Sequence, residues 1–377
     1  MAFSAETLEG TAFRGEPDWL HERRRGALAA FERLPLPSKT DEEWRRTDVS
    51  GLNVSDFTEL EHKNGFKLVG LSPLPKSVIL EPLRVAAEKH PSLVEPLLFS
   101  LIRADRDRFS ALHAAFFTGG TFLYVPDGVA VTEPILAQHF SHAGGNAVLP
   151  HSLIVAGRGA RFQYLDEYIG DADEDAGYRS GSAEIFVGEG AEVGYVSLQK
   201  WGRHAWHFGD QRARVEASLV GQGSDAELKA IYLASGEQFF DFHTLQDHQV
   251  GNTRSDLLFK GALQDVARTV YAGLIRIEKG AARSDAYQAN RNLVLSDHAK
   301  ATSIPMLEID NNDVRCTHGA TVGPVDPQHM FYLRSRGIPE ATAKRMLVQG
   351  FFGDVLERIP FEGARKLVEA ELEARLG

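Results

Sequence analysis

The chain has 377 residues, of which 43% are hydrophobic and 25% charged, so it is long enough for two or three domains and has an ordinary globular composition. Its formal net charge of −11 disfavours nonspecific binding to nucleic acid, because that binding needs a basic surface. No apolar run approaches ~18 residues, no secretory signal pattern opens the chain, and only one cysteine is present, so we expect a cytoplasmic protein without a membrane segment or internal disulfide.

The first third of the chain, residues 1–117, is predicted to be a helical domain. Apolar residues at helical spacing predict a helix that starts near Asp18 and is stopped by Pro35. Thr40 and Glu43 have the spacing of a capping box. A later helical stripe places His113 on an apolar face, where we interpret it as a core histidine. The stripe of the first helix consists of Leu20, Ala27, Phe31 and Leu34.

Residues 118–323 are predicted to be a β domain built from repeated units. Short segments with strand character follow one another. Three of them share the same pattern, in which an apolar pair is followed by a glycine turn and then by alternating apolar and polar residues. Their second glycines, Gly159, Gly190 and Gly223, are spaced by 31 and then 33 residues. A β unit that repeats at about 30 residues favours a parallel β-helix with glycines at its corners. A β-sandwich with coincidental glycine turns stays the alternative.

Residues 324–377 are predicted to be helical again. Asp326 can cap a helix that has Pro327 at its first position and ends at Gly337, and Pro339 precedes a second helix. The second helix carries more apolar surface than these helices can bury alone. Part of that surface packs either on the β core or on another protein, and the sequence leaves both open. The apolar residues are Met346, Leu347, Phe351, Val355, Leu356 and Ile359.

Motifs for common catalytic sites are not found in the sequence. No G-x-x-x-x-G-K-[ST] phosphate loop and no G-x-S-x-G elbow occurs, and both H-x-x-H pairs are interpreted as surface or loop histidines. One enzyme class stays open as a remote alternative, a β-helical carbohydrate lyase or hydrolase that uses carboxylates on adjacent coils. Its candidate residues are Asp241, Asp247, Glu308 and Asp310.

The stretch 310–323 contains the single cysteine, Cys316, and His318 two positions later. In a strand, alternation places both side chains on one face, together with Val314. Thiolate and imidazole are ligands of zinc, iron and iron–sulfur clusters, and His318 or Arg315 is expected to lower the thiol pKa. A metal site needs three or four protein ligands, so the remaining ligands would come from a partner subunit, another histidine or a carboxylate, which suggests an intersubunit or transient site. The alternative is a buried cysteine beside a hydrogen-bonded histidine.

Residues 311–351, with C-x-H-x-A-T at 316–321 and FYLRSRGI at 331–338, resemble the C-terminal signature of the SufB/SufD family of iron–sulfur cluster assembly proteins. Gly319 and the single cysteine resemble the SufD branch more than the SufB branch. The resemblance implies a right-handed parallel β-helix between two helical domains, in a non-catalytic scaffold subunit. It also implies a heterodimer with SufB and binding of the ATPase SufC, which supplies the phosphate loop.

The resemblance further implies a transient iron–sulfur cluster, shared with SufB, that His318 and also Cys316 contact. Reduced flavin is an implied component of the complex, although the sequence has no flavin motif. A SufB-like paralogue acting as a homodimeric scaffold is the alternative, and a homodimer is also expected when the chain is isolated. The expected SufB interface comprises Asn312, Val314, Thr317 and Thr321. The expected SufC contacts are Phe331, Tyr332, Arg334, Arg336, Met346, Leu347, Phe351 and Phe352.

Overall fold

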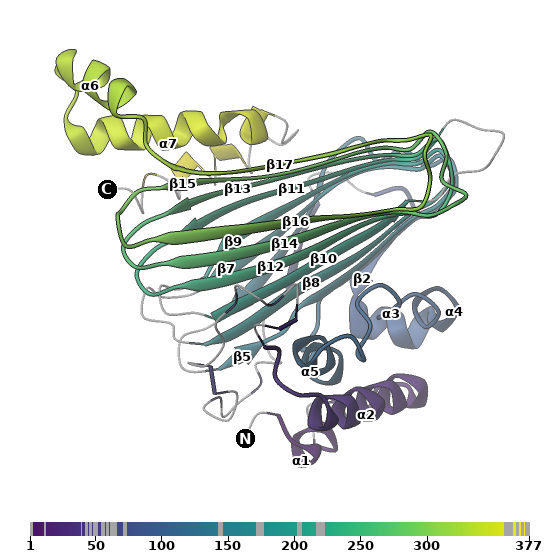
Figure 1. Ribbon diagram of the computed structural model, residues 1–377. Coiled ribbons are helices and arrows are strands. Elements are labelled where there is room, and N and C mark those ends of the chain that lie inside the picture. The colour runs from purple at the N-terminus through teal and green to yellow at the C-terminus, as the bar shows by residue number, and fades with distance from the viewer. Residues whose placement is uncertain are drawn as a thin grey trace.

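The computed structural model shows a parallel β-helix with helices at both ends of the chain, which confirms the predicted fold class (Figure 1). The described residues are 3–10, 13–38, 66–70, 74–141, 146–170, 177–201, 206–215 and 223–357, with isolated positions between 40 and 60 and beyond 364. The predicted partner of Thr40 in the capping box, Glu43, lies outside them, as does Ile359. The exact domain boundaries stay predictions.

The strands alternate along the chain between two sheets, so that each coil contributes one strand to each sheet. All pairings are parallel except β1 with β4 and β2 with β3. The first sheet contains β1 (Phe66–Gly70), β4 (Ile135–Ser141), β7 (Arg161–Gly170), β9 (Glu192–Lys200), β11 (Asp225–Ala234), β13 (Arg254–Leu263), β15 (Asp285–Val294) and β17 (Arg315–Pro324). The second contains β2 (Ile79–Pro82), β3 (Thr121–Val125), β6 (His151–Ala156), β8 (Tyr178–Val187), β10 (Trp206–Val215), β12 (Phe239–His248), β14 (Arg268–Ile277) and β16 (Lys300–Ile309), with β5 (Ala147–Val148) beside β8.

The register of the first sheet confirms the repeat of about 30 residues. One column of charged residues starts successive strands, and its members are separated by 31, 33, 29, 31 and 30 residues. Oppositely charged neighbours in this column form ion pairs at the surface, such as Arg254 with Asp225 at 2.7 Å. The column consists of Arg161, Glu192, Asp225, Arg254, Asp285 and Arg315.

The glycines of the repeat lie at corners between strands, but for two different reasons. Gly159 and Gly190 have φ values of 63° and 65°, a left-handed conformation that glycine adopts without steric penalty. Gly223 precedes β11, and a Cβ at this position would lie 1.1 Å from the carbonyl oxygen of Asn252. Glycine is therefore needed at Gly223 for the close approach of the next coil.

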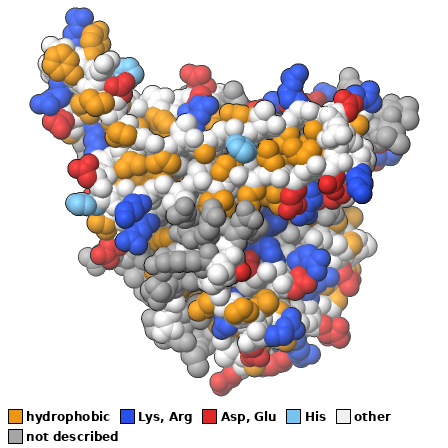
Figure 2. Space-filling view, in the orientation of Figure 1, with side chains coloured by type: hydrophobic (Ala, Val, Ile, Leu, Met, Phe, Trp, Pro, Cys, Tyr) orange, Lys and Arg blue, Asp and Glu red, His pale blue; other side chains and the backbone are white. Residues whose placement is uncertain are grey.

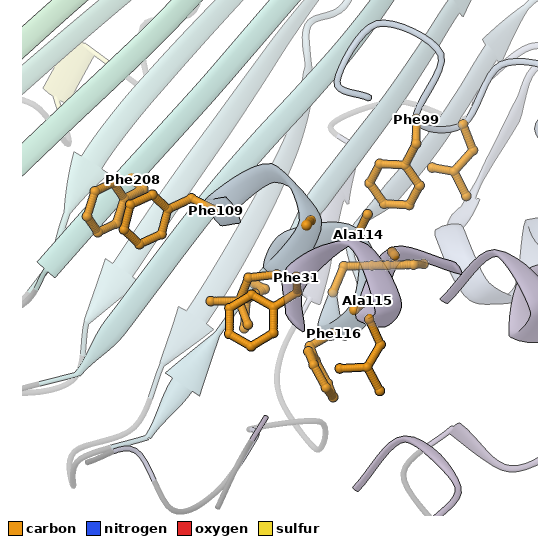
Figure 3. Packing of buried hydrophobic residues seen from close by; sticks show 14 of the residues in the cluster. Phe31, Phe99, Phe109, Ala114, Ala115, Phe116 and Phe208 are labelled. Carbon is orange, nitrogen blue, oxygen red and sulfur yellow. The ribbon is translucent and has the colours of Figure 1, made fainter. Parts of the chain in front are cut away.

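The N-terminal helices cover the outer face of the second sheet (Figure 1). The helix predicted from Asp18 is α2 (Asp18–Arg33), and it packs against α5 (Arg108–Phe116). Figure 3 shows Phe109 of α5 lying on Phe208 of β10, and the two rings stack at 4.5 Å between centroids. His113 is buried between Ser180 and His151, as the prediction of a core histidine requires. Three short helices complete this layer: α1 (Ala5–Leu8), α3 (Leu83–Lys89) and α4 (Pro91–Val94).

Two C-terminal helices, α6 (Pro327–Ser335) and α7 (Glu340–Glu357), follow the last strand. The Asp326 carboxylate accepts a hydrogen bond from the Gln328 amide at 2.8 Å, and Gly337 has φ of 82°, so the predicted start and stop of the first of these helices are confirmed. Four side chains of α7 pack on the outer face of the first sheet, whereas α6 buries no side chain. In Figure 1, α7 lies over the left-hand part of the first sheet and α6 projects beyond the sheet. The buried residues of α7 in this contact are Val348, Phe352, Val355 and Leu356.

The two alternatives for the C-terminal apolar surface therefore apply to different helices. The apolar surface of α7 is largely buried against the β core, whereas that of α6 has no fully buried side chain. Among the helices in the described parts of the chain, none combines the length and apolarity that a bilayer crossing requires.

Candidate functional site

The last coil of the β-helix has no following coil to cover it. Within the described residues, β16 pairs only with β14 and β17 only with β15, so each strand leaves one backbone edge unpaired. Every residue of β16 and β17 is at least partly exposed, whereas all of β12 is buried. The side chains that point toward the interior in earlier coils are therefore accessible in this coil, which we call the open end.

Cys316 and His318 lie on one face of β17, as the alternation predicts. Their register partners on β15 are Ala286 and Gln288, both fully buried in the interior of the β-helix. Cys316 is half-buried and packs with Val314 against a small apolar cluster that includes Ala286. His318 is exposed. The two side chains thus continue interior columns of the β-helix to its open end.

The thiol of Cys316 has a raised pKa, contrary to the expected lowering by His318 or Arg315. Burial is the main cause, and the neighbouring Asp285 carboxylate adds to it, so that the pKa of Cys316 rises to about 11. Arg315 lies in register with Asp285 and its guanidinium is 3.6 Å from that carboxylate, so its charge is largely compensated. At neutral pH the thiol of this chain is therefore protonated, and a bound metal would have to displace the proton.

Exposed apolar side chains also lie at the open end. Leu307, Ile309 and Val322 are 38%, 42% and 48% exposed, and they stand in register with the buried Ile275, Ile277 and Asn292 of the coil below. Figure 2 shows hydrophobic side chains along the strip over β16 and β17. These three residues were not predicted from the sequence, although strand alternation with no following repeat is a signal for them.

The residues predicted to form the partner interface do not all lie on one face. Thr317 and Thr321 are exposed and lie in register with Tyr287 and Arg291, on the outer side of the first sheet. Asn312 is exposed in the turn before β17, and Val314 packs inward beside Cys316. The open end therefore offers two surfaces to a partner, an inner apolar one and an outer polar one.

Three of the four carboxylates of the remote enzyme alternative have a side-chain partner. Asp241 is buried, accepts a hydrogen bond from Thr47 at 2.8 Å and lies 3.2 Å from His243. Glu308 is exposed and pairs with Arg276 at 2.9 Å. Asp247 is buried and accepts from Gln249, and Asp310 is exposed after β16. Among the described residues, no group of three or more His, Cys, Asp or Glu side chains is arranged to hold a metal ion.

The predicted contacts for an ATPase lie mostly on the uncovered side of α6 and α7. Phe331, Tyr332 and Met346 are 75%, 56% and 44% exposed. Arg336 lies over the Tyr332 ring at 5.2 Å, and Arg334 pairs with Glu340 at 3.3 Å. These five side chains form an exposed surface that we call the α6 surface, although Met346 belongs to α7.

Three of the predicted contacts turn out to be partly or wholly covered. Phe352 is fully buried against the first sheet, so it is not part of the α6 surface. Phe351 is half-buried beneath the ammonium group of Lys260, 4.7 Å from its ring, and Leu347 is half-buried. The spacing of Val348, Phe352, Val355 and Leu356 is that of a buried helical stripe, which was the available signal.

The fold and the open end together define a parallel β-helix protein that ends in an unpaired coil and an exposed helix. Two family models match this chain and show which family it belongs to. The model for "SUF system FeS cluster assembly, SufBD core domain" matches residues 139–218 and 210–351, and the model for "SufBD protein N-terminal region" matches residues 67–136. The chain belongs to the SufBD family of the SUF iron–sulfur cluster assembly system.

Individual relatives agree with this assignment. The chain is 29% identical to "Iron-sulfur cluster assembly protein SufD" of Bacillus subtilis, over 96% of this chain and 95% of the relative. A SufBD family protein of Mycobacterium tuberculosis is 31% identical over 72% of this chain and 74% of its own length. A SufBD family protein of Staphylococcus haemolyticus is 24% identical over 98% and 92%, respectively.

Proposed function

We propose that this chain is a SufD-type scaffold subunit of iron–sulfur cluster assembly that does not itself catalyse a reaction. The observation that carries the proposal is the open end, where Cys316 and His318 stand at an unpaired strand edge and exposed apolar side chains also lie. A cluster needs more ligands than these two, and a second subunit is the natural source of the others. The nascent cluster is the cargo of this site.

In this proposal the partner at the open end is SufB. Unpaired backbone groups of β16 and β17 favour a partner that adds strands to both sheets, because each buried peptide group then gains a hydrogen bond. Burial of Leu307, Ile309 and Val322 would supply the apolar contribution. His318, which is exposed, would contact the cluster first, and Cys316 would contribute once its proton is displaced.

The α6 surface is proposed to bind the ATPase SufC. Exposed aromatic and arginine side chains are typical of the centre of protein interfaces. Phe331, Tyr332 and Arg336 supply them at a helix that has no fully buried side chain. Reduced flavin in the assembled complex and a cytoplasmic setting stay predictions.

The test is His318→Ala in the complex reconstituted with SufB and SufC. Because His318 is exposed and the structure gives it no hydrogen bond or ion pair among the described residues, the complex is expected to assemble while iron–sulfur absorbance fails to develop. His90→Ala, a change at a part-exposed histidine of the N-terminal layer, is the matched control and should leave cluster formation intact. Unchanged cluster formation in His318→Ala would show that the cluster site lies elsewhere.

The homodimeric scaffold is the second candidate function, because an unpaired open end can also pair with a second copy of the chain. The native mass of the complex recovered from cells decides between the two. A heterodimer with bound ATPase supports the SufD-type function, and a homodimer that carries a cluster supports the alternative.

A further inference from the structure

A groove of about 510 Å³ lies between the segment 100–106 and the outer face of the second sheet. Four arginines line it, and two leucines, Leu101 and Leu245, supply an apolar strip. No residue of β17 or α6 contributes to it, so it is separate from the open end and the α6 surface. We call it the arginine groove; its arginines are Arg103, Arg106, Arg212 and Arg276.

The deepest of these side chains, Arg212, is only 9% exposed. Its Nε donates to Asp210 at 2.9 Å, and the structure gives its two terminal nitrogens no partner among the described residues. A guanidinium has five N–H donors, and the terminal nitrogens of Arg212 are not among the fully buried unpaired atoms of the described residues, so they can donate to water or to an anion in the groove. The terminal nitrogens of Arg212 are thus available to a ligand in the groove.

The surrounding carboxylates hold the arginines of the groove in place. Arg106 contacts Asp107 at 2.6 Å and Asp210 at 2.8 Å, on the same carboxylate that binds Arg212. The groove itself is lined by four arginines and two aspartates, Asp105 and Asp247, in a chain whose net charge is −11. Asp107, Asp210 and Glu308 also contact these arginines, so the carboxylates at the groove outnumber the arginines by one. An anion would therefore be held by the terminal nitrogens of Arg212 and not by an excess of positive charge.

The shape of the donors indicates which anion fits. A guanidinium presents two parallel N–H groups that match two oxygens of a phosphate, and it holds them with more geometric specificity than a lysine does. The volume of the groove lies in the range typical of small-molecule sites. Leu101 and Leu245 lie beside the charged groups, where an apolar part of the ligand would rest.

We propose that the arginine groove is a binding site for a phosphate monoester with an apolar or aromatic substituent, held by Arg212 from β10 and Arg276 from β14. Arg276 is 39% exposed and anchored by Glu308 at 2.9 Å, so it stands at the rim, opposite the buried Arg212. This site does not depend on the cluster-assembly proposal.

The experiment is isothermal titration of the full-length chain with phenyl phosphate, inorganic phosphate and phenol. Phenyl phosphate is expected to bind best, inorganic phosphate more weakly because it lacks the apolar group, and phenol not at all. Arg212→Gln should weaken phenyl phosphate by at least about tenfold, the expected effect of losing a charge-assisted contact. Asp247→Asn should strengthen it, since it removes a negative charge from the lining.

Controls separate loss of binding from loss of folding. Arg158→Gln is the matched control, because Arg158 is 72% exposed at a distant corner and, among the described residues, its guanidinium pairs with Asp127. If Arg212→Gln melts at a lower temperature than the unmodified chain, Arg276→Gln at the rim replaces it as the test variant. No saturable binding at about 10 mM phenyl phosphate, or equal binding by the folded arginine variants and the unmodified chain, would overturn the proposal.

Discussion

Substitution of Phe352 tests how α7 is held on the β-helix. Its side chain is fully buried in the cluster that joins α7 to the first sheet. Replacement of a buried phenylalanine by alanine typically costs about 3–5 kcal/mol, because apolar contacts are lost and a cavity remains. The polar contacts of Lys260 with Asp354 and with the Phe351 carbonyl would survive the change.

The expected effect of Phe352→Ala is therefore local weakening of α7 docking. Hydrogen exchange of the α7 amides should accelerate by about 100-fold or more, since each 1.4 kcal/mol corresponds to a factor of ten. Amides of the central strands, such as β12, should keep their protection unless the whole molecule loses stability with the helix.

Phe331→Ala provides the matched control, because it makes the same chemical change on the neighbouring helix. Phe331 is 75% exposed, so its loss should change the free energy of unfolding by less than about 0.5 kcal/mol. It should, however, weaken capture of SufC in a binding assay with purified subunits, as loss of an exposed aromatic anchor does. Unchanged exchange of α7 in Phe352→Ala, or equal destabilisation by both variants, would refute the assignment of one residue to packing and the other to docking.

Two further predictions concern the thiol and a buried carboxylate. With its pKa raised to about 11, Cys316 should react with a disulfide reagent at pH 8 about tenfold more slowly than an ordinary thiol. A higher pKa makes the thiolate more nucleophilic, but the smaller fraction of thiolate present at pH 8 outweighs that gain. Asp285→Asn should lower that pKa and accelerate the reaction, and a rate equal to that of free cysteine would contradict the assigned burial. Glu184→Gln should destabilise the chain by about 2–4 kcal/mol in urea unfolding, because the carboxylate is fully buried and accepts hydrogen bonds from the Phe99 amide and from His151. A change below about 0.5 kcal/mol would show that the amide is accommodated there.

The sequence by itself determined the features that depend on neighbours in the chain. The repeat of about 30 residues, the helix from Asp18, the cap at Asp326 and the shared face of Cys316 and His318 all follow from local periodicity and local hydrogen bonding. These interactions span a few residues, so a pattern in the sequence is enough to predict them. The family resemblance added the function, which the fold alone does not specify.

The tertiary structure alone decided the features that depend on residues distant in sequence. Phe352 is buried because β11 and β13 lie beneath α7, and the Cys316 thiol is held protonated by burial and by Asp285 of the preceding coil. In the arginine groove, Arg106 of the helical layer and Arg212 of the second sheet contact the same carboxylate, that of Asp210. Burial and pKa depend on everything that surrounds a group in space, and the order of residues along one strand or helix does not specify those surroundings.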